Sequence, residues 1–263
     1  MSSKPDLLER HLRDLPYFRA ILRAVEARMM RGVSLPSPVL DLGCGDGHFA
    51  SVTFYPGATV GIDPELSSLR EASRRGAYRL LVQARGDRLP FAVGSFASAF
   101  SNSVLEHVEG LPEVMAEISR VLQPGASLAI TVPNPGYRRE LHVPQLLRRI
   151  GLRRIGERYR AWFMRMSRTK NLLDEEGWGR LCRQFGLVIE KSERYFSPAA
   201  LHALEWGHYL GAPTLLPHLL TGRWILWRSR WNLLLTDRLV RRYYEELPSR
   251  EGTYTFFLVR KQL

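Results

Sequence analysis

The sequence predicts an α/β protein built on a doubly wound sheet of seven strands, mostly parallel, with helices on both faces and helical insertions. Short apolar runs alternate with helical patterns over about 100 residues, which is typical of parallel strands joined by helices. Two more strand-like runs follow towards the C-terminus. The chain has 263 residues, of which 45% are hydrophobic, and this is enough to bury one large core.

We expect residues 1–38 to form an N-terminal helical cap. Apolar residues from Asp6 to Met30 recur at the spacing of one helix face. The segment SLPSP at 34–38 then breaks the chain before the first strand. The first residues, MSSKPDLLERHLRDL, carry charges where a secretory signal needs an apolar run, so we expect a cytoplasmic protein.

Residues 39–263 form one predicted domain, in which five strands alternate with helices before a last helix and two last strands. The strands are predicted at 39–42, 59–62, 79–83, 96–101, 127–132, 187–195 and 254–259. The helices are predicted to begin at His48 and to cover 66–75, 111–122 and 172–185. Two insertions interrupt this domain, a basic one at 134–170 and a helical one rich in Leu, Trp and Arg at 197–250.

The positive charge is concentrated in one part of the chain. The formal net charge is +12, yet residues 1–132 hold 14 basic and 14 acidic residues. The stretch 138–170 holds 11 basic residues against Glu140 and Glu157. Most of them are Arg, which makes planar, bidentate contacts with phosphate and carboxylate groups. A general bias towards Arg on a solvated face explains the residue type equally well, but it explains the clustering less well.

The two cysteines, Cys44 and Cys182, are too few for a disulfide framework. No spacing of Cys and His indicates a zinc site. We therefore expect both thiols to be reduced and structural, and we predict no metal.

The stretch VLDLGCGDGHF at 39–49 joins a buried strand to a glycine loop that opens a helix. Gly43, Gly45 and Gly47 allow the backbone to approach a ligand closely. A dinucleotide site has a third glycine where this chain has His48, which is too bulky for that role. The observed Gly-x-Gly-x-Gly spacing, preceded by Asp41, matches a loop for S-adenosylmethionine (SAM) better.

Asp63 ends the second predicted strand, where its carboxylate can accept hydrogen bonds from both hydroxyls of a ribose. Capping the helix that begins at Leu66 is the alternative role, and the two roles can coexist. The glycine loop and Asp63 together favour a nucleoside with an amino-acid end over an ordinary strand-to-helix turn.

Four segments, including the glycine loop and the end of the second strand, carry a resemblance to the class I SAM-dependent methyltransferases. The resemblance is to the quinone-biosynthesis and small-molecule (type 11) group in particular. The segments are VLDLGCGDG, GID, RLPFAVGSFASAFSNSVLEHV and RVLQPGASLAITVPNP, and LLDEEGWGRLCRQFGLVIE extends the likeness. The resemblance implies a Rossmann-like methyltransferase fold, SAM as cofactor and S-adenosylhomocysteine as product. It is specific for the cofactor and only weakly specific for the acceptor.

The resemblance also implies the positions of cofactor-binding residues. Asp41, Gly43 and Gly45 would surround the methionine end, Asp63 the ribose, and Asn102 and Ser103 the sulfonium. The implied set further contains Cys44, Gly47, Pro64, Asp87, Arg88 and Leu89.

Two positions depart from the family pattern. Relatives usually place an Asp where this chain has Arg85, so Asp87 would contact adenine only if the loop is shortened. Ala97 stands where relatives often have Asp, at a position that is more structural than functional.

Methyl transfer from a sulfonium can proceed largely by alignment of the reactants, and a general base matters mainly for hydroxyl acceptors. His107 in LEHV is the nearest candidate base, although a packing or capping role suits it as well. His142, His202 and His208 lie in the insertions and could face the acceptor instead.

The second insertion has apolar residues at helical spacing, interrupted by arginines, and no stretch long enough to span a membrane. One interpretation is a helical lid over the sheet. The other is an interfacial helix that makes peripheral membrane contact through 213–242, at the inner face of the membrane. Either suits a hydrophobic acceptor. The residues that carry the pattern are Leu216, Leu220, Trp224, Trp227, Trp231 and Leu234.

The sequence therefore predicts a SAM-dependent methyltransferase that acts on oxygen or carbon of a hydrophobic or lipid-linked small molecule. The alternatives are an RNA methyltransferase, suggested by the basic half of the chain, and a non-catalytic SAM-binding partner protein. Against nucleic acid, SNSVLEH follows the fourth strand in place of the Asn-Pro-Pro-aromatic element typical of amino-methylating enzymes. Oligomeric state leaves no signal in the sequence.

Overall fold

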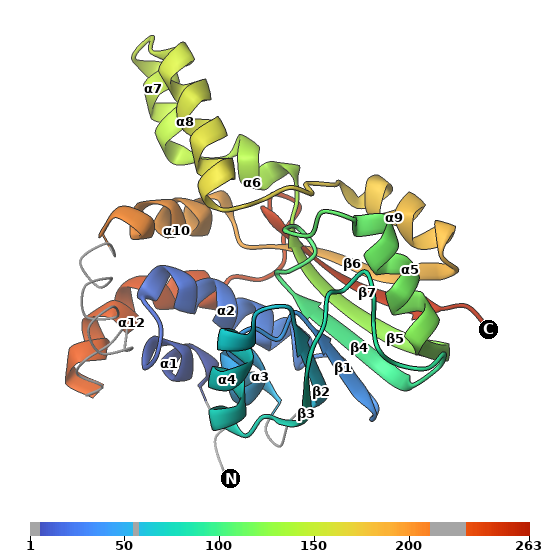
Figure 1. Ribbon diagram of the computed structural model, residues 1–263. Coiled ribbons are helices and arrows are strands. Elements are labelled where there is room, and N and C mark those ends of the chain that lie inside the picture. Colours follow the sequence, from blue (N-terminus) through green and yellow to red (C-terminus); the bar gives the residue numbers. More distant parts are fainter. Residues whose placement is uncertain (1–5, 55–57, 211–229) are drawn as a thin grey trace.

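The computed structural model describes residues 6–54, 58–210 and 230–263, and it contains a seven-stranded sheet in the order β3-β2-β1-β4-β5-β7-β6 (Figure 1). The strands are β1 Val39–Leu42, β2 Ala58–Asp63, β3 Tyr78–Gln83, β4 Phe96–Asn102, β5 Leu122–Pro133, β6 Leu187–Tyr195 and β7 Tyr254–Lys261. The helices are α1 Leu7–Leu12, α2 Tyr17–Met30, α3 His48–Thr53, α4 Leu66–Arg75, α5 Leu111–Val121, α6 Pro135–Arg139, α7 His142–Arg149, α8 Arg153–Met166, α9 Glu175–Gln184, α10 Pro198–Leu210 and α12 Arg230–Glu245.

The first five strands are parallel, and β7 runs antiparallel to both of its neighbours, β5 and β6. The predicted mostly parallel sheet of seven strands is therefore confirmed. The order reverses direction at β1, which lies between β2 and β4. In open α/β sheets a ligand crevice forms outside the carboxyl ends of the strands at such a point.

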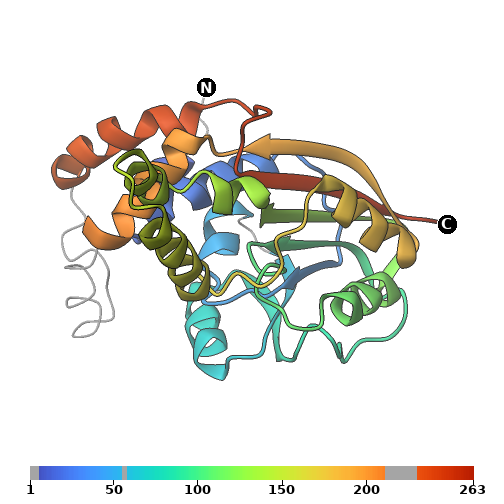
Figure 2. The same cartoon turned by 90° about the horizontal axis from the view of Figure 1, so that it is seen from above.

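Helices cover both faces of the sheet (Figure 2). Side chains of the central strands alternate between two cores, one on each face. Phe100 and Ala129 pack on the face covered by α1, α2 and α10. Leu128 and Ile130 pack on the other face, against α5 and α9. Both cores are needed because a parallel sheet buries both of its faces.

The N-terminal segment folds as two helices, although the helical spacing of its apolar residues continues through both. Asp6 caps α1 by accepting hydrogen bonds from the backbone N–H groups of Leu8 and Glu9. Pro16 stands immediately before α2 and has no N–H to continue the first helix, so the chain turns there. Helix α2 then packs against α10 and α12, the helices of the second insertion.

The basic insertion folds as α6, α7 and α8, and the α7–α8 pair projects from the body of the molecule (Figure 1). The second insertion contributes α10 and α12. Leu216, Leu220, Trp224 and Trp227 lie outside the described residues, as does most of the segment 213–242. Within the described residues, no helix has the length and apolar character that crossing a membrane requires.

Candidate cofactor and acceptor site

The glycine loop closes tightly over the end of β2. The backbone N–H groups of Gly43 and Cys44 both donate to the carbonyl oxygen of Ile62, at 2.9 and 2.8 Å. Gly43 has φ +79°, and a Cβ on it would lie 2.5 Å from Cγ1 of Val104. Only glycine fits this position, because both the backbone angle and the space exclude a side chain.

Asp63 lies at the carboxyl end of β2 and bridges the two loops beside it. Its Oδ2 accepts a hydrogen bond from the N–H of Gly45, and its Oδ1 accepts one from the N–H of Glu65, both at 2.9 Å. Glu65 occupies the N-cap position of α4, so Asp63 is not the cap of that helix. A carboxylate has about four acceptor sites, so a half-buried Asp63 retains capacity for hydroxyl donors.

A cavity of about 450 Å³ opens beside Asp63. Its lining includes five of the residues singled out from the sequence, namely Gly43, Asp63, Pro64, Asp87 and His107. The other contributors are Leu42 of β1, Ile62 of β2 and Val114 of α5, together with the loop after β3, the segment after β4 and Arg168. Segments that follow four different strands therefore meet at one edge of the sheet.

Asp41 lies apart from this cavity and is almost fully buried. Its Oδ2 accepts a hydrogen bond of 2.6 Å from the hydroxyl of Tyr78, which joins β1 to β3. Burial raises the pKa of Asp41 to about 7, although the Tyr78 hydrogen bond opposes this rise. The structure therefore gives Asp41 a bracing position under the glycine loop.

The remaining glycine-loop residues shape the turn without lining the cavity. Gly47 has φ +72° at the N-cap of α3, and a Cβ there would lie 3.0 Å from Ala72. Cys44 is buried, and burial raises the pKa of its thiol. Gly45 contributes its N–H to Asp63 and has open space where a Cβ would point.

The loop after β3 brings Arg85, Gly86 and Asp87 to the cavity, whereas the next two residues do not line it. Arg85, the departure from the family pattern, pairs with Asp87 at 2.7 Å and so lowers the pKa of that carboxyl. Arg88 is exposed and does not line the cavity. Leu89 is buried, and its N–H donates to Glu117 Oε2 at 2.7 Å.

Glu26 of α2 gathers the polar side chains at the end of β4, and sequence reasoning missed it. Its carboxylate accepts hydrogen bonds from Asn102 Nδ2 at 2.8 Å and from Ser103 Oγ at 2.6 Å. Tyr195 OH and Arg23 also bind it, at 3.3 and 3.2 Å. Glu26 is fully buried, one turn beyond Leu22 on the apolar face of the helix. An acid in that apolar stripe was the signal that could have found it.

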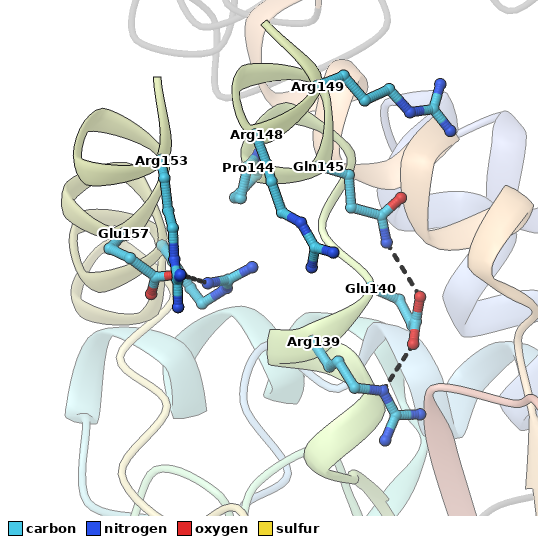
Figure 3. Close-up of a pocket in the computed structure, with 9 residues that line it drawn as sticks. Arg139, Glu140, Pro144, Gln145, Arg148, Arg149, Arg153 and Glu157 are labelled. Carbon is cyan, nitrogen blue, oxygen red and sulfur yellow. Dashed lines mark hydrogen bonds and ion pairs between the residues drawn. The ribbon is translucent and has the colours of Figure 1, made fainter. Parts of the chain in front are cut away.

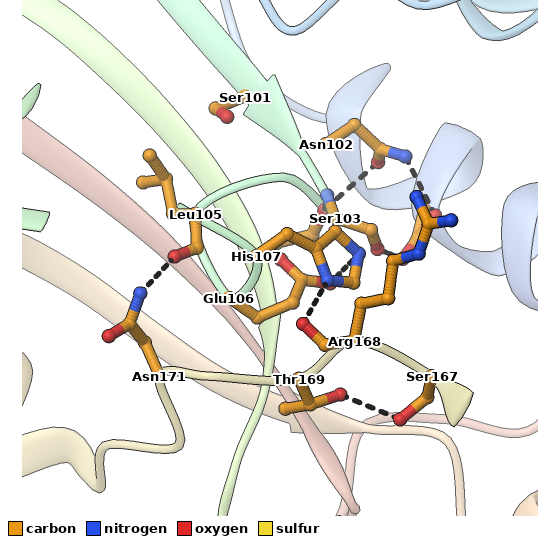
Figure 4. Close-up of polar contacts among 12 residues, drawn as sticks. Ser101, Asn102, Ser103, Leu105, Glu106, His107, Ser167, Arg168, Thr169 and Asn171 are labelled. Carbon is orange, nitrogen blue, oxygen red and sulfur yellow. Dashed lines mark hydrogen bonds and ion pairs between the residues drawn. The ribbon is translucent and has the colours of Figure 1, made fainter. Parts of the chain in front are cut away.

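A second cavity, of about 250 Å³, adjoins this cluster. Its lining combines six apolar or aromatic residues with eight polar or titratable ones, among them Arg19, Arg23 and Glu106. His107 lines this cavity and the first one, so its side chain stands between them (Figure 4). The apolar and aromatic members are Phe18, Leu22, Pro133, Tyr137, Leu204 and Tyr254.

His107 and Glu106 are the titratable pair at this boundary (Figure 4). His107 Nδ1 lies 3.1 Å from the carbonyl oxygen of Arg168, which can only accept, so this nitrogen carries the proton. Its Nε2 then holds a lone pair, 3.7 Å from Glu106 Oε1. Burial lowers the pKa of His107 and keeps the imidazole neutral.

Glu106 is a buried carboxyl whose Oε2 has no hydrogen-bond partner within the described residues. Burial raises its pKa to about 8, and the nearby Glu26 adds to this rise. An unpartnered carboxyl oxygen beside a cavity is costly to bury, so it is a natural contact for a polar group of a bound molecule.

The other histidines considered from the sequence fall into two places. His208 lines the second cavity, where its Nδ1 bonds the carbonyl oxygen of Leu204 and its ring packs at a tilt against Phe18. His142 and His202 stack on each other, with ring centroids 4.4 Å apart, at the base of the α7–α8 pair. Neither lines the two cavities described above.

Comparisons with known proteins relate this chain to methyltransferases. Residues 40–130 match the family model described as a methyltransferase domain. The malonyl-[acyl-carrier protein] O-methyltransferase of Legionella pneumophila is 35% identical over 112 residues, covering 40% of this chain and 39% of that protein. The enzyme of that name from Pseudescherichia vulneris is 34% identical over 112 residues, with shares of 42% and 45%. The matches thus span less than half the length of these relatives.

Solved structures share the fold at low identity. A possible histamine N-methyltransferase from Thermotoga maritima aligns with TM-score 0.55 and 15% identity, covering 94% of this chain and 91% of that one. The geranyl diphosphate C-methyltransferase of Streptomyces coelicolor, solved with S-adenosyl-L-homocysteine, aligns with TM-score 0.56 and 14% identity, covering 90% and 75%. These likenesses establish the architecture of the sheet and its helices.

Proposed function

We propose, from the class I SAM-dependent methyltransferase domain of the type 11 group that this chain carries, that the protein methylates oxygen or carbon of a hydrophobic or lipid-linked small molecule. SAM is the cofactor of this domain. The observation that carries the proposal is the meeting of two cavities at His107, one beside Asp63 and one whose lining combines an apolar and aromatic part with arginines and other polar groups.

The first cavity suits the cofactor by the chemistry of its lining. The carboxylate of Asp63 offers acceptors for a ribose diol. Gly43 has no side chain, so a ligand can approach the backbone of the loop there. Pro64 and Asp87 also line this cavity, where the nucleoside would lie. When bound, SAM supplies a methyl group on a positively charged sulfur.

The second cavity suits an apolar acceptor with one polar or acidic end. Its aromatic wall would hold the apolar part, while Arg19 and Arg23 would favour a carboxylate or another anion. Relatives named for methylation of malonyl-[acyl-carrier protein] support an acyl-linked acceptor within this class. The wall and His107 would align the acceptor atom, and orientation alone can supply about 7 to 11 kcal/mol.

His107 would act as the general base for a hydroxyl acceptor. Its Nε2 lone pair can take the acceptor proton, and the carbonyl oxygen of Arg168 holds the ring in that tautomer. Glu106 Oε1 lies 3.7 Å from Nε2, and above the raised pKa of Glu106 its ionised carboxylate would stabilise the imidazolium that forms. A carboxylate acceptor needs no base, so dependence on His107 separates the two acceptor types.

The test measures S-adenosylhomocysteine formed by the purified chain with SAM and, in separate reactions, a lipid extract, a quinol mixture and mixed RNA. We expect turnover with a lipid or quinol fraction and a product heavier by one CH₂ group in mass spectrometry. His107→Gln is expected to lower kcat for a hydroxyl acceptor by at least about 100-fold.

Two results would contradict the proposal. Turnover with RNA alone would identify an RNA methyltransferase, and its affinity for RNA would then fall steeply with salt. SAM binding by calorimetry without turnover on any acceptor would identify a non-catalytic SAM-binding protein.

A further inference from the structure

The α7–α8 hairpin is a rigid projection anchored at its base. Gly156 of α8 lies so close to α7 that a Cβ there would be 3.2 Å from the carbonyl oxygen of Pro144. At the base, the carboxylate of Glu205 accepts hydrogen bonds from the N–H groups of His142 and Val143. Phe163 is fully buried in the core beneath. The hairpin therefore holds its tip at a fixed place away from the body (Figure 1).

The tip of this hairpin exposes large apolar side chains. Ile150 is 63% exposed, Leu152 43% and Ile155 50%. Leu146, one turn before Ile150, is 43% exposed. These residues lie next to one another in and around the short turn between the helices, so they form one apolar tip. Exposed apolar groups gathered on one projection indicate contact with a partner.

A cleft of about 490 Å³ lined by arginines lies between α6, α7 and α8 (Figure 3). Arg139 pairs with Glu140 at 2.7 Å, and Arg160 pairs with Glu157 at 2.5 Å. The cleft also contains Arg148, Arg149 and Arg153, and each of these three has no ion pair or hydrogen bond from its side chain within the described residues.

The apolar tip and the unpaired arginines interleave in one segment, RRIGLRRI at 148–155. We propose that this segment docks the protein on a membrane surface of anionic phospholipid, with Ile150, Leu152 and Ile155 among the acyl chains and the arginines on the phosphates. Arginine side chains can extend their stems along apolar groups and keep their charge at the level of the headgroups.

Charge and shape together favour a lipid surface over other occupants. Nucleic acid would match the arginines, but it would leave the exposed side chains of Ile150, Leu152 and Ile155 in water. A second copy of this chain would bring a like-charged cleft against the first. A lipid layer accepts both parts at once, because its phosphates lie just above its apolar interior.

Docking would also place the acceptor cavity near the membrane. Ser167 and Thr169, which directly follow α8, line the second cavity. Helix α8 has 14 residues, so it separates the tip from that cavity by about 20 Å. This consequence rests on the proposed function, whereas the docking itself does not.

The experiment measures binding of the full chain to sucrose-loaded vesicles of phosphatidylcholine, with and without phosphatidylglycerol. We expect binding to the mixed vesicles that weakens with salt. Ile150→Ser with Leu152→Ser is expected to weaken it at least about tenfold by loss of apolar burial. Arg148→Glu with Arg153→Glu is expected to weaken it at least about tenfold, since each basic residue contributes a factor of about five.

Matched controls carry the same changes elsewhere on the surface. Arg70→Glu with Arg74→Glu alters net charge equally on exposed positions of α4, and Val93→Ser with Leu247→Ser removes exposed apolar groups. Both should bind within about twofold of the parent, because neither touches the hairpin. SAM affinity by calorimetry and circular dichroism verify the fold of every variant.

Three results would overturn the docking proposal. One is equal binding of the parent to both vesicle types, and another is an equal loss in the α4 charge control. The third is a tip variant that keeps vesicle binding and instead loses self-association or affinity for an acidic carrier protein, which would assign the surface to that occupant. Because vesicle binding is measured without turnover, a failure of the proposed methyl transfer leaves this result unaffected.

Discussion

The sheet region, residues 39–133, buries most of its apolar side chains, whereas the α7–α8 hairpin exposes apolar side chains to water. In the sheet region, apolar side chains of β4 and β5 are buried on both faces, and 10 acidic residues outnumber 7 basic ones. In the hairpin, α7 and α8 bury only Pro144, Gly156 and Phe163, while arginines and apolar side chains meet water. Packing therefore explains the sequence of the first region, and an external contact explains that of the second.

The largest expected difference concerns the free energy of unfolding. Phe100→Ala removes a side chain that is 1% exposed and packs on Phe54 with ring centroids 4.8 Å apart, so we expect a loss of about 3 to 5 kcal/mol. Ile150→Ala at the hairpin tip should change it by less than about 0.5 kcal/mol. Urea denaturation measures both, and a comparable loss for Ile150→Ala would show that the tip belongs to the folded core.

A buried and an exposed carboxyl should contribute differently to the pH dependence of stability. Burial raises the pKa of Glu106 to about 8 from an unfolded value of 4.5, so the folded state holds the proton longer. The free energy of unfolding that Glu106 contributes is complete below pH 4.5 and is lost as pH rises through 8. Asp41, with its pKa raised to about 7, acts in the same direction.

As pH rises from 5 to 7.5, the free energy of unfolding of Glu106→Gln should therefore increase by about 3 kcal/mol relative to that of the parent. Glu157→Gln on the hairpin should change stability by less than about 1 kcal/mol, because its ion pair with Arg160 is exposed and the pair lowers the pKa of Glu157. Urea titrations at several pH values measure the difference. A flat difference for Glu106→Gln would mean that water or an ion compensates this carboxyl.

The third contrast uses two glycines with the same backbone angle. Gly43 and Gly151 have φ of +79° and +80°, so Ala strains both alike. At Gly43 the new methyl group would also meet Val104, whereas at Gly151 nothing lies within 4 Å. We expect Gly43→Ala to lose about 2 kcal/mol more than Gly151→Ala in thermal unfolding. Equal losses would show that the loop near Gly43 relaxes freely.

Periodicity and loop motifs predicted the sheet region closely. Helix α4 and strands β1 and β6 have the predicted bounds, and the other five strands differ from prediction by one or two residues at an end, apart from the early start of β5. These elements are predictable because each carries its own signal, either an apolar run or a glycine turn. Prediction was weaker for the N-terminal segment, where apolar spacing continues through the break at Pro16.

The candidate site was less predictable, since its members come from distant segments. Motifs led to Gly43, Asp63 and His107 because these residues follow strands directly. Glu26 lies far before them in the chain, and Arg168 lies far after them, so only the fold brings them to the same edge. For the hairpin, the sequence indicated its charge, but exposure of Ile150 depends on packing that no local pattern records.

The smallest contrast separates cofactor binding from hairpin charge. Asp63→Ala should weaken SAM affinity about tenfold or more, equivalent to about 1.4 kcal/mol, because a charged acceptor beside the cavity is lost. Arg148→Ala with Arg153→Ala should leave the affinity unchanged, since neither residue lines that cavity. Calorimetry with both variants decides the matter: an unchanged affinity in Asp63→Ala would remove this carboxylate from the site, and a loss in the arginine variant would couple the hairpin to it.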